Sequence, residues 1–177
     1  MELLHKNTEN LKEYINLHSA DQATVLQALE RIRESGNIHY LNLLFEMLLS
    51  DPPYEIRKEI LSMLGSVKLK QSASLFIEAI NDSKYLKIRK ELLMACWQSD
   101  LDFTPYYPEL IQIIIDSDWE TAFEAFTIIE NSDYLPDSVI CTLEAEKIKN
   151  LSDQPDEMKK YLLNALLGIL IDGEKSS

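Results

Sequence analysis

Apolar residues recur along this chain in short helical stripes, and the stripes repeat with a spacing of 32 residues. Three rows of positions show the spacing: Ala28, Ile60 and Leu92; Leu29, Leu61 and Leu93; and Ile32, Leu64 and Cys96. Leu44 with Phe76 and Leu48 with Ile80 follow the same spacing. A fixed period of this length is typical of stacked helical hairpins, each of which buries its apolar face against the next. No stretch alternates cleanly between apolar and polar residues, so we expect an all-α protein.

The stripes and the residues that interrupt them predict a series of helices. They cover residues 8–18, 22–34, 38–49, 54–64, 72–80, 85–97, 104–115, 119–129 and 135–151, and a last helix follows Pro155. Asp21 is placed to cap the second helix and Gly36 to end it, while Pro52 and Pro53 suit the start of a new first turn. In the helix over 135–151, the expected apolar face consists of Val139, Ile140, Leu143 and Ile148.

The repeats also share a polar pattern. Asp51 stands in the turn between two predicted helices and Arg57 lies early in the second of them. Asp82 and Arg89 occupy the same places one repeat later, whereas the third copy has Phe123 at the position of the arginine. The three copies resemble HEAT repeats of the armadillo-like helical superfamily, in which this Asp and this Arg recur. We interpret the two Asp/Arg pairs as structural contacts that hold neighbouring hairpins together.

The resemblance implies a right-handed α-α superhelix, a HEAT-like solenoid of about five helical hairpins. We expect one domain over residues 1–177, with an N-terminal hairpin over 1–35, the three clearest repeats over 36–131 and a C-terminal capping hairpin over 132–177. Solenoids of this kind act by binding, so the resemblance favours a non-enzymatic protein-binding module or scaffold.

The net charge of -13 is confined to one part of the chain. Between Glu91 and Glu146 there are 13 Asp and Glu residues and no Lys or Arg, whereas the remainder carries 17 basic residues and is neutral. Such a field repels nucleic acid and anionic membranes and attracts cationic partners. We therefore expect no nucleic-acid binding and no membrane binding, and a protein partner with a basic segment.

Second helices of successive HEAT hairpins line a concave surface, so the resemblance also implies where a partner binds. The exposed candidates toward the acidic end are Lys90, Glu91, Met94, Trp97, Trp119, Glu120, Glu124 and Thr127. Eight aromatic residues between Trp97 and Tyr134 reinforce this choice, because acids beside exposed aromatic rings suit recognition of Arg and Lys. In the alternative interpretation, Phe103, Phe126 and one tyrosine of this group belong to the core.

No residue pattern indicates catalysis. The three histidines lack metal-ligand spacing, the four glycines form no phosphate loop, and Cys96 and Cys141 lie within apolar stripes. We therefore expect no cofactor, no metal and no enzymatic activity, with a HEAT-like enzyme such as a lyase as an alternative.

The segment from Tyr161 to Ile171 is apolar nearly all round. A helix of this kind requires burial on more than one side. We expect it to fold against its neighbours as a cap, and a homodimer or larger homo-oligomer built through it is the alternative. The N-terminus lacks the apolar run of a signal peptide, which favours a cytoplasmic location.

Overall fold

The computed structural model describes residues 16–36, 38–151 and 157–174 of the 177-residue chain. Over these residues the protein is all-α, with nine α-helices, three short 3₁₀ helices and no strand. The predicted helix over 8–18 lies outside the described residues except for its last three. The chain divides into two compact units, Met1–Leu64 and Gly65–Ser177.

The first unit contains three described α-helices, which are α2 (Gln22–Ser35), α3 (Leu41–Leu49) and α4 (Tyr54–Leu64). As predicted, Asp21 caps α2 by accepting a hydrogen bond from the backbone N–H of Thr24 at 3.0 Å. Gly36 ends the helix at φ 59°, in the left-handed region that glycine adopts at little cost. Both α2 and α3 pack against α4. The contact between α2 and α4 carries an ion pair of Arg33 with Glu59.

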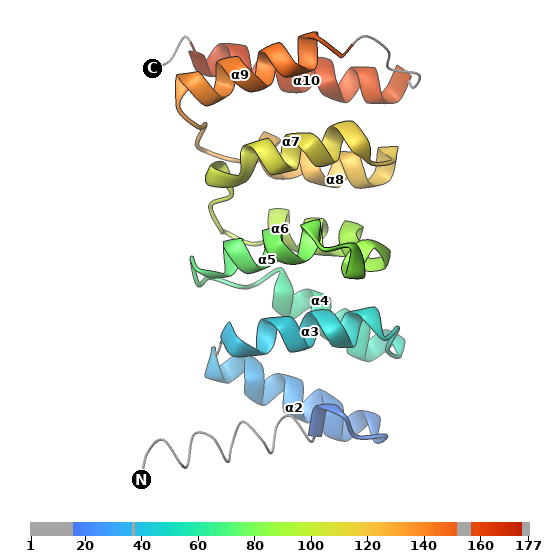
Figure 1. Cartoon of the computed structure of the whole chain (residues 1–177). Coiled ribbons are helices and arrows are strands. Elements are labelled where there is room, and N and C mark those ends of the chain that lie inside the picture. Colours follow the sequence, from blue (N-terminus) through green and yellow to red (C-terminus); the bar gives the residue numbers. More distant parts are fainter. Residues whose placement is uncertain (1–15, 37, 152–156, 175–177) are drawn as a thin grey trace. The chain divides into compact units, whose positions relative to one another are not determined.

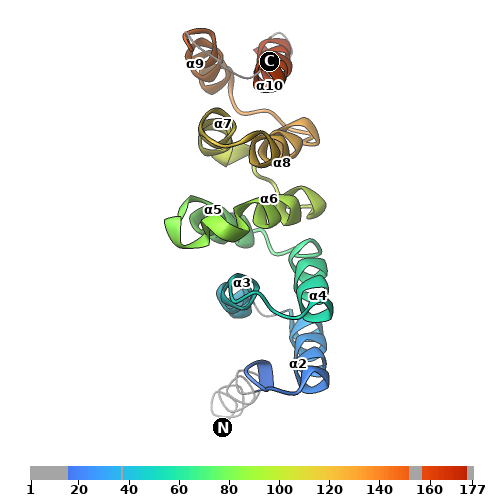
Figure 2. The ribbon, with the colours of Figure 1, turned by 90° about the vertical axis from the view of Figure 1, so that its right-hand side faces the viewer.

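The second unit contains three pairs of helices. They are α5 (Ser72–Asn81) with α6 (Arg89–Gln98), α7 (Tyr107–Asp116) with α8 (Trp119–Glu130), and α9 (Ser138–Lys149) with α10 (Glu157–Glu174). Within this unit α6, α8 and α10 form one row and α5, α7 and α9 form the other (Figures 1 and 2). Helix α8 packs on both α6 and α10, so its side chains are held from two directions.

Helix starts in this unit depend on aspartates. Asp118 caps α8 by accepting from the N–H of Thr121 at 2.9 Å, and Asp137 caps α9. The helix predicted over 85–97 is divided, because Asp82 caps a 3₁₀ helix, Ser83–Ile88, before α6 begins. The other two 3₁₀ helices likewise precede α-helices, at Ile38–Tyr40 and Thr104–Tyr106.

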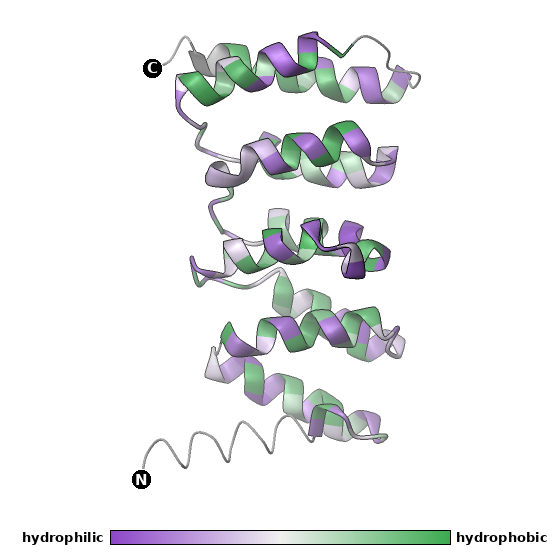
Figure 3. Ribbon diagram, viewed as in Figure 1, coloured by the Kyte–Doolittle hydropathy of each residue, from purple (hydrophilic) through white to green (hydrophobic). Residues whose placement is uncertain are grey.

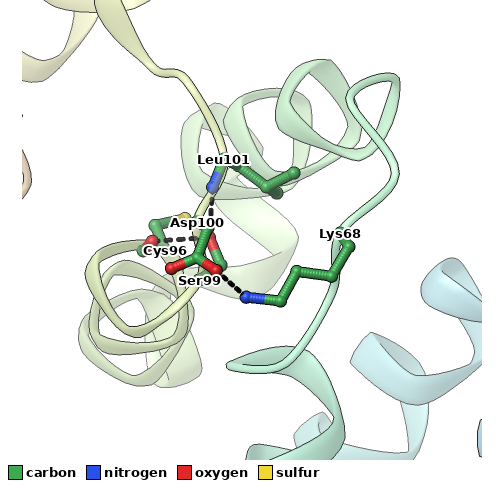
Figure 4. A network of polar contacts seen from close by, with 5 residues as sticks. All are labelled: Lys68, Cys96, Ser99, Asp100 and Leu101. Atoms are coloured by element: carbon green, nitrogen blue, oxygen red, sulfur yellow. Dashed lines mark hydrogen bonds and ion pairs between the residues drawn. The ribbon is translucent and has the colours of Figure 1, made fainter.

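The loop after α6 is fixed by polar contacts (Figure 4). Ser99, which is largely buried, donates its hydroxyl to the carbonyl of Cys96 at 2.7 Å and accepts from the N–H of Leu101 at 3.4 Å. Asp100 forms an ion pair with Lys68, which lies in the loop before α5. These contacts define the end of α6, the helix that carries Trp97.

The repeating apolar positions form the core of both units. Buried positions are Ala28, Leu29, Ile32, Leu44, Leu48, Ile60, Leu64, Phe76, Ile80, Leu92, Leu93 and Cys96. Leu61 is half-buried, and Met63 is buried nearby in α4. The 32-residue spacing therefore identified the buried face of these helices, as an amphipathic period should.

The apolar face expected for α9 is partly wrong. Val139 and Leu143 are 64% and 59% exposed, while Cys141, Ala145 and Ile148 form the buried face. Figure 3 shows green, apolar segments alternating with purple, hydrophilic ones along α9, which packs on α10 and on α7.

Helix α10 packs on α9 and α8 through a buried face of Leu162, Leu163, Leu166 and Leu170. Its opposite face exposes Lys160, Tyr161, Asn164 and Gly168, so the helix is more amphipathic than its sequence suggests. This packing favours the capping interpretation of α10. Among the described helices, none is long and apolar enough to cross a membrane.

Candidate protein-binding surface

Helices α6 and α8 lie side by side, and two side-chain contacts connect their exposed edges. Lys90 of α6 forms an ion pair with Glu120 of α8. Two turns further along α6, the indole N–H of Trp97 donates to a carboxylate oxygen of Glu124 at 2.8 Å. These two contacts bring four of the predicted binding residues together on one surface. They are Lys90, Trp97, Glu120 and Glu124. We call this region the α6–α8 surface.

The charges on the α6–α8 surface are coupled. The hydrogen bond with Glu120 raises the pKa of Lys90, and the negative charges of Glu120, Glu124 and Asp118 raise it further. The backbone N–H of Thr121 lowers the pKa of Asp118. Both shifts favour the charged forms of Lys90 and Asp118 at neutral pH. Glu120 is paired with the ammonium group of Lys90, whereas Glu124 accepts a hydrogen bond from the uncharged indole of Trp97.

Exposed aromatic rings lie around Glu124. Trp97 is 37% exposed and Phe123 is 45% exposed, and the rings of Trp119 and Phe123 lie 5.7 Å apart between centroids. A carboxylate beside exposed rings can hold a guanidinium or ammonium group by an ion pair and a cation–π contact together. The surface therefore has the chemistry to recognise Arg or Lys side chains.

The other predicted binding residues contribute less. Glu91 and Met94 are half-buried on α6, and Trp119 is half-buried at the start of α8. The hydroxyl of Thr127 donates to the carbonyl of Phe123 at 2.8 Å, so this polar group is engaged within its own helix. The surface is thus centred on the contacts of Lys90, Trp97, Glu120 and Glu124.

Part of the aromatic cluster belongs to the core. Phe103, Phe126 and Tyr107 are each at most 3% exposed, which confirms the alternative interpretation for these three rings. Phe123 was not among the predicted binding residues, although it is exposed beside Glu124. Phe123 occupies the position at which the repeat pattern has an arginine. This replacement was the feature of the sequence that could have identified Phe123 as a binding residue.

The predicted structural pairs are found in one repeat and not in the next. Arg57 of α4 forms an ion pair with Asp51 at 3.2 Å, within the hairpin of α3 and α4 and not between neighbouring hairpins. Arg89 instead donates its Nε–H to the carbonyl of Ile80 at 2.8 Å. Asp82 does not pair with Arg89, because it accepts from the N–H of Lys84 at 2.9 Å as the cap of the 3₁₀ helix.

Within the described residues, no group of three or more His, Cys, Asp and Glu side chains is placed to hold a metal ion. The thiol of Cys96 is buried, and burial raises its pKa well above the ordinary value. Cys96 therefore stays protonated near neutral pH and does not act there as a nucleophile.

Comparisons with protein-family models, with curated proteins and with solved structures find no match to this chain. The case for a function therefore depends on the geometry of the molecule itself.

Proposed function

We propose that the chain is a HEAT-like α-solenoid that acts as a non-enzymatic protein-binding module, and that the α6–α8 surface binds a basic segment of a partner protein. The row of α6, α8 and α10 and the burial of equivalent repeat positions support the solenoid. The observation that carries the binding function is the contact of Glu124 with Trp97 beside the exposed ring of Phe123. Glu124 thus accepts a hydrogen bond from one aromatic side chain and is adjacent in sequence to a second, exposed one.

Lys90 gives the proposed surface a competitor within the chain. Its ammonium group occupies Glu120 much as a lysine of the partner would. A basic partner therefore binds at Glu124, and at Glu120 it either displaces Lys90 or shares the carboxylate with it. Because exposed ion pairs are weak and are screened by salt, we expect the affinity to fall steeply as the salt concentration rises.

The test measures binding of a fluorescent Arg-rich peptide by anisotropy at low salt. Glu124→Gln keeps an oxygen that accepts from the indole of Trp97 but removes the charge. We expect this variant to weaken binding by about tenfold, which corresponds to the loss of one charge-assisted contact. Lys90→Gln should strengthen binding, because it releases Glu120 for the peptide.

Glu130→Gln is the matched control, since Glu130 is an exposed acid at the other end of α8. It changes the net charge by the same amount as Glu124→Gln. If the two variants weaken binding equally, the peptide responds only to net charge and the α6–α8 surface is not a site. If Glu124→Gln weakens binding more than Glu130→Gln does, native partners can be sought by capture from a lysate. The wild-type protein and Glu124→Gln are used side by side, with elution by a salt gradient.

Self-assembly through α10 is the alternative function. Tyr161 is 70% exposed on this helix, whereas the leucines of its other face are already buried against α9 and α8. A homodimer through Tyr161–Ile171 would therefore use the exposed face. Tyr161→Ser leaves the core intact, so a decrease in the mass measured by light scattering on this substitution would favour the dimer.

A further inference from the structure

A second exposed surface lies along α9 and the loop before it. Leu135, Val139 and Leu143 are spaced by four residues and are 38%, 64% and 59% exposed, and the neighbouring Tyr134 is 68% exposed. We call these four residues the α9 stripe. The buried face of α9 is formed by other residues, so packing of the described chain does not explain the stripe.

The α9 stripe is held in place by hydrogen bonds. The buried Tyr107 donates its hydroxyl to the carbonyl of Tyr134 at 3.0 Å, and the hydroxyl of Ser132 donates to the same carbonyl at 2.9 Å. Asp137 accepts from the N–H groups of Val139 and Ile140 at 3.0 and 3.1 Å. A surface ordered in advance loses little conformational entropy when a partner binds.

The charges around the α9 stripe indicate what kind of partner fits. Asp133 and Asp137 are exposed at its start, and Glu146 is exposed beyond its last apolar residue. The first basic residue after the stripe, Lys147, is paired with Glu144, which leaves Lys149 as the exposed cation near the far end. The start of the stripe is thus acidic, and its far end is close to neutral.

This charge pattern distinguishes between possible occupants. A second copy of the chain would bring Asp133, Asp137 and Glu146 near the same acids of its partner, at a net charge of -13 for each copy. A segment with Lys or Arg at one end and apolar residues along one face would complement both the acids and the stripe. The exposed Tyr134 beside the two aspartates can also contact such a cation.

We propose that the α9 stripe binds an amphipathic helix of another protein, whose apolar face covers Val139 and Leu143 and whose Lys or Arg residues lie near Asp133 and Asp137. This surface differs from the α6–α8 surface, and the two proposals do not depend on each other. Its affinity comes mainly from apolar burial, which salt does not weaken, so binding should persist at a salt concentration that abolishes binding at the α6–α8 surface.

The experiment uses a fluorescent synthetic peptide of about five helical turns, with Leu at every third or fourth position and Lys at one end. Binding to the full chain is measured by anisotropy at raised salt. The variant Val139→Ser/Leu143→Ser changes only exposed side chains, and circular dichroism checks that it folds. Leu86→Ser is the matched control, because Leu86 is a 55% exposed apolar residue elsewhere in the same unit.

We expect the double variant to weaken binding by about tenfold, as loss of central apolar contacts does, and Leu86→Ser to leave it unchanged. Asp137→Asn keeps a capping side chain and removes one charge, so it should weaken binding less than the double variant. At low salt, where exposed charges are less screened, a peptide with Glu in place of Lys should bind more weakly than the Lys peptide to Glu124→Gln, the variant in which the α6–α8 surface is weakened. Glu124→Gln should have no effect, which separates this proposal from the α6–α8 surface.

Four results would overturn the proposal: no binding of the peptide to the wild-type chain, equal binding to the double variant, equal binding of the Glu and Lys peptides at low salt, or a wild-type dimer that the double variant dissociates. The last result would identify a second copy as the occupant.

Discussion

Lys159 of α10 donates from Nζ to the backbone carbonyl of Ser117 at 2.6 Å, which connects α10 to the turn between α7 and α8. Ser117 is the residue that ends α7, where the helix dipole is negative and carbonyl groups lack helical partners. A lysine at this point therefore satisfies a helix end and holds the last helix of the chain in place.

The first prediction concerns this contact. Lys159→Met should keep the packing of the aliphatic stem but leave the carbonyl of Ser117 without its charged donor. We expect the free energy of unfolding in urea to fall by about 1.5 to 3 kcal/mol, the range of a hydrogen bond to a charged group. Hydrogen exchange should become faster in α10 first, because the helix loses its connection to the α7–α8 turn.

Lys160→Met is the control for this experiment. Among the residues that the structure describes, Lys160 pairs only with Glu157, at 2.8 Å and three residues away on the exposed face of the same helix. Such a pair contributes about 0.5 kcal/mol or less. Equal losses of stability in the two variants would mean that the contact of Lys159 with Ser117 does not hold α10.

A second prediction follows from the backbone of Asp51. Its φ is 59°, which makes it the one non-glycine residue with positive φ within the described ranges. Its carboxylate also pairs with Arg57. Asp51→Ala should destabilise the protein by about 1 kcal/mol, because alanine keeps the Cβ that is strained at this φ and lacks the short polar side chain that helps aspartate adopt it.

Asp51→Gly separates the two roles of this residue. Glycine adopts the same φ without strain but loses the carboxylate that pairs with Arg57. Because Asp51 is mostly exposed, the pair contributes little, and the glycine variant should stay within about 1 kcal/mol of the wild type. A large loss in Asp51→Gly, measured by urea unfolding, would show that the carboxylate and not the backbone determines the effect.

The periodic part of the fold could be predicted from the sequence. Ala28, Ile60 and Leu92 are each fully buried, since a hairpin that repeats must bury the same face each time. The helix ends at Asp21 and Gly36 could also be predicted from the sequence, because caps depend on a few neighbouring residues.

The remaining features depend on how helices meet. The contact of Trp97 with Glu124 joins residues 27 positions apart, and it requires the register of α6 on α8. The exposure of Val139 could not be read from the sequence either, because α9 has two apolar faces and the positions of α10 and α7 decide between them. Arg89 likewise could bind a carboxylate or a carbonyl. Because Asp82 caps the 3₁₀ helix, Arg89 donates to the carbonyl of Ile80.

A third prediction concerns Ser72, whose hydroxyl is buried and finds no hydrogen-bond partner in the described part of the chain. A buried polar group without a partner costs about 1 to 3 kcal/mol, and alanine is the better helix former. Ser72→Ala should therefore raise the free energy of unfolding by about 1 kcal/mol. Ser74→Ala, measured in parallel, should lower it slightly, because Ser74 donates to the carbonyl of Gln71 at 3.1 Å. A loss of stability in Ser72→Ala would indicate that its hydroxyl has a partner in solution.

The last prediction concerns alkaline pH. Burial raises the pKa of the Cys96 thiol well above its ordinary value of 9.0 and raises that of the Tyr107 hydroxyl above 10.0. Above about pH 9 the unfolded chain loses the thiol proton while the folded chain retains it, so the unfolded state becomes more favourable. The free energy of unfolding should be flat with respect to these groups below pH 9 and should fall as the pH rises beyond it. Each group contributes at most about 1.4 kcal/mol per pH unit.

Cys96→Ala removes one of the two titrating groups. The substitution lowers stability at every pH because it leaves a small cavity, so the comparison is made between slopes and not between absolute values. Of Cys96 and Tyr107, Cys96 begins to titrate first in the unfolded chain, between about pH 9 and pH 10, and the variant should show a shallower decline there. Urea unfolding at a series of pH values measures both slopes. An unchanged slope would mean that the thiol of Cys96 ionises as readily in the folded protein as in the unfolded chain.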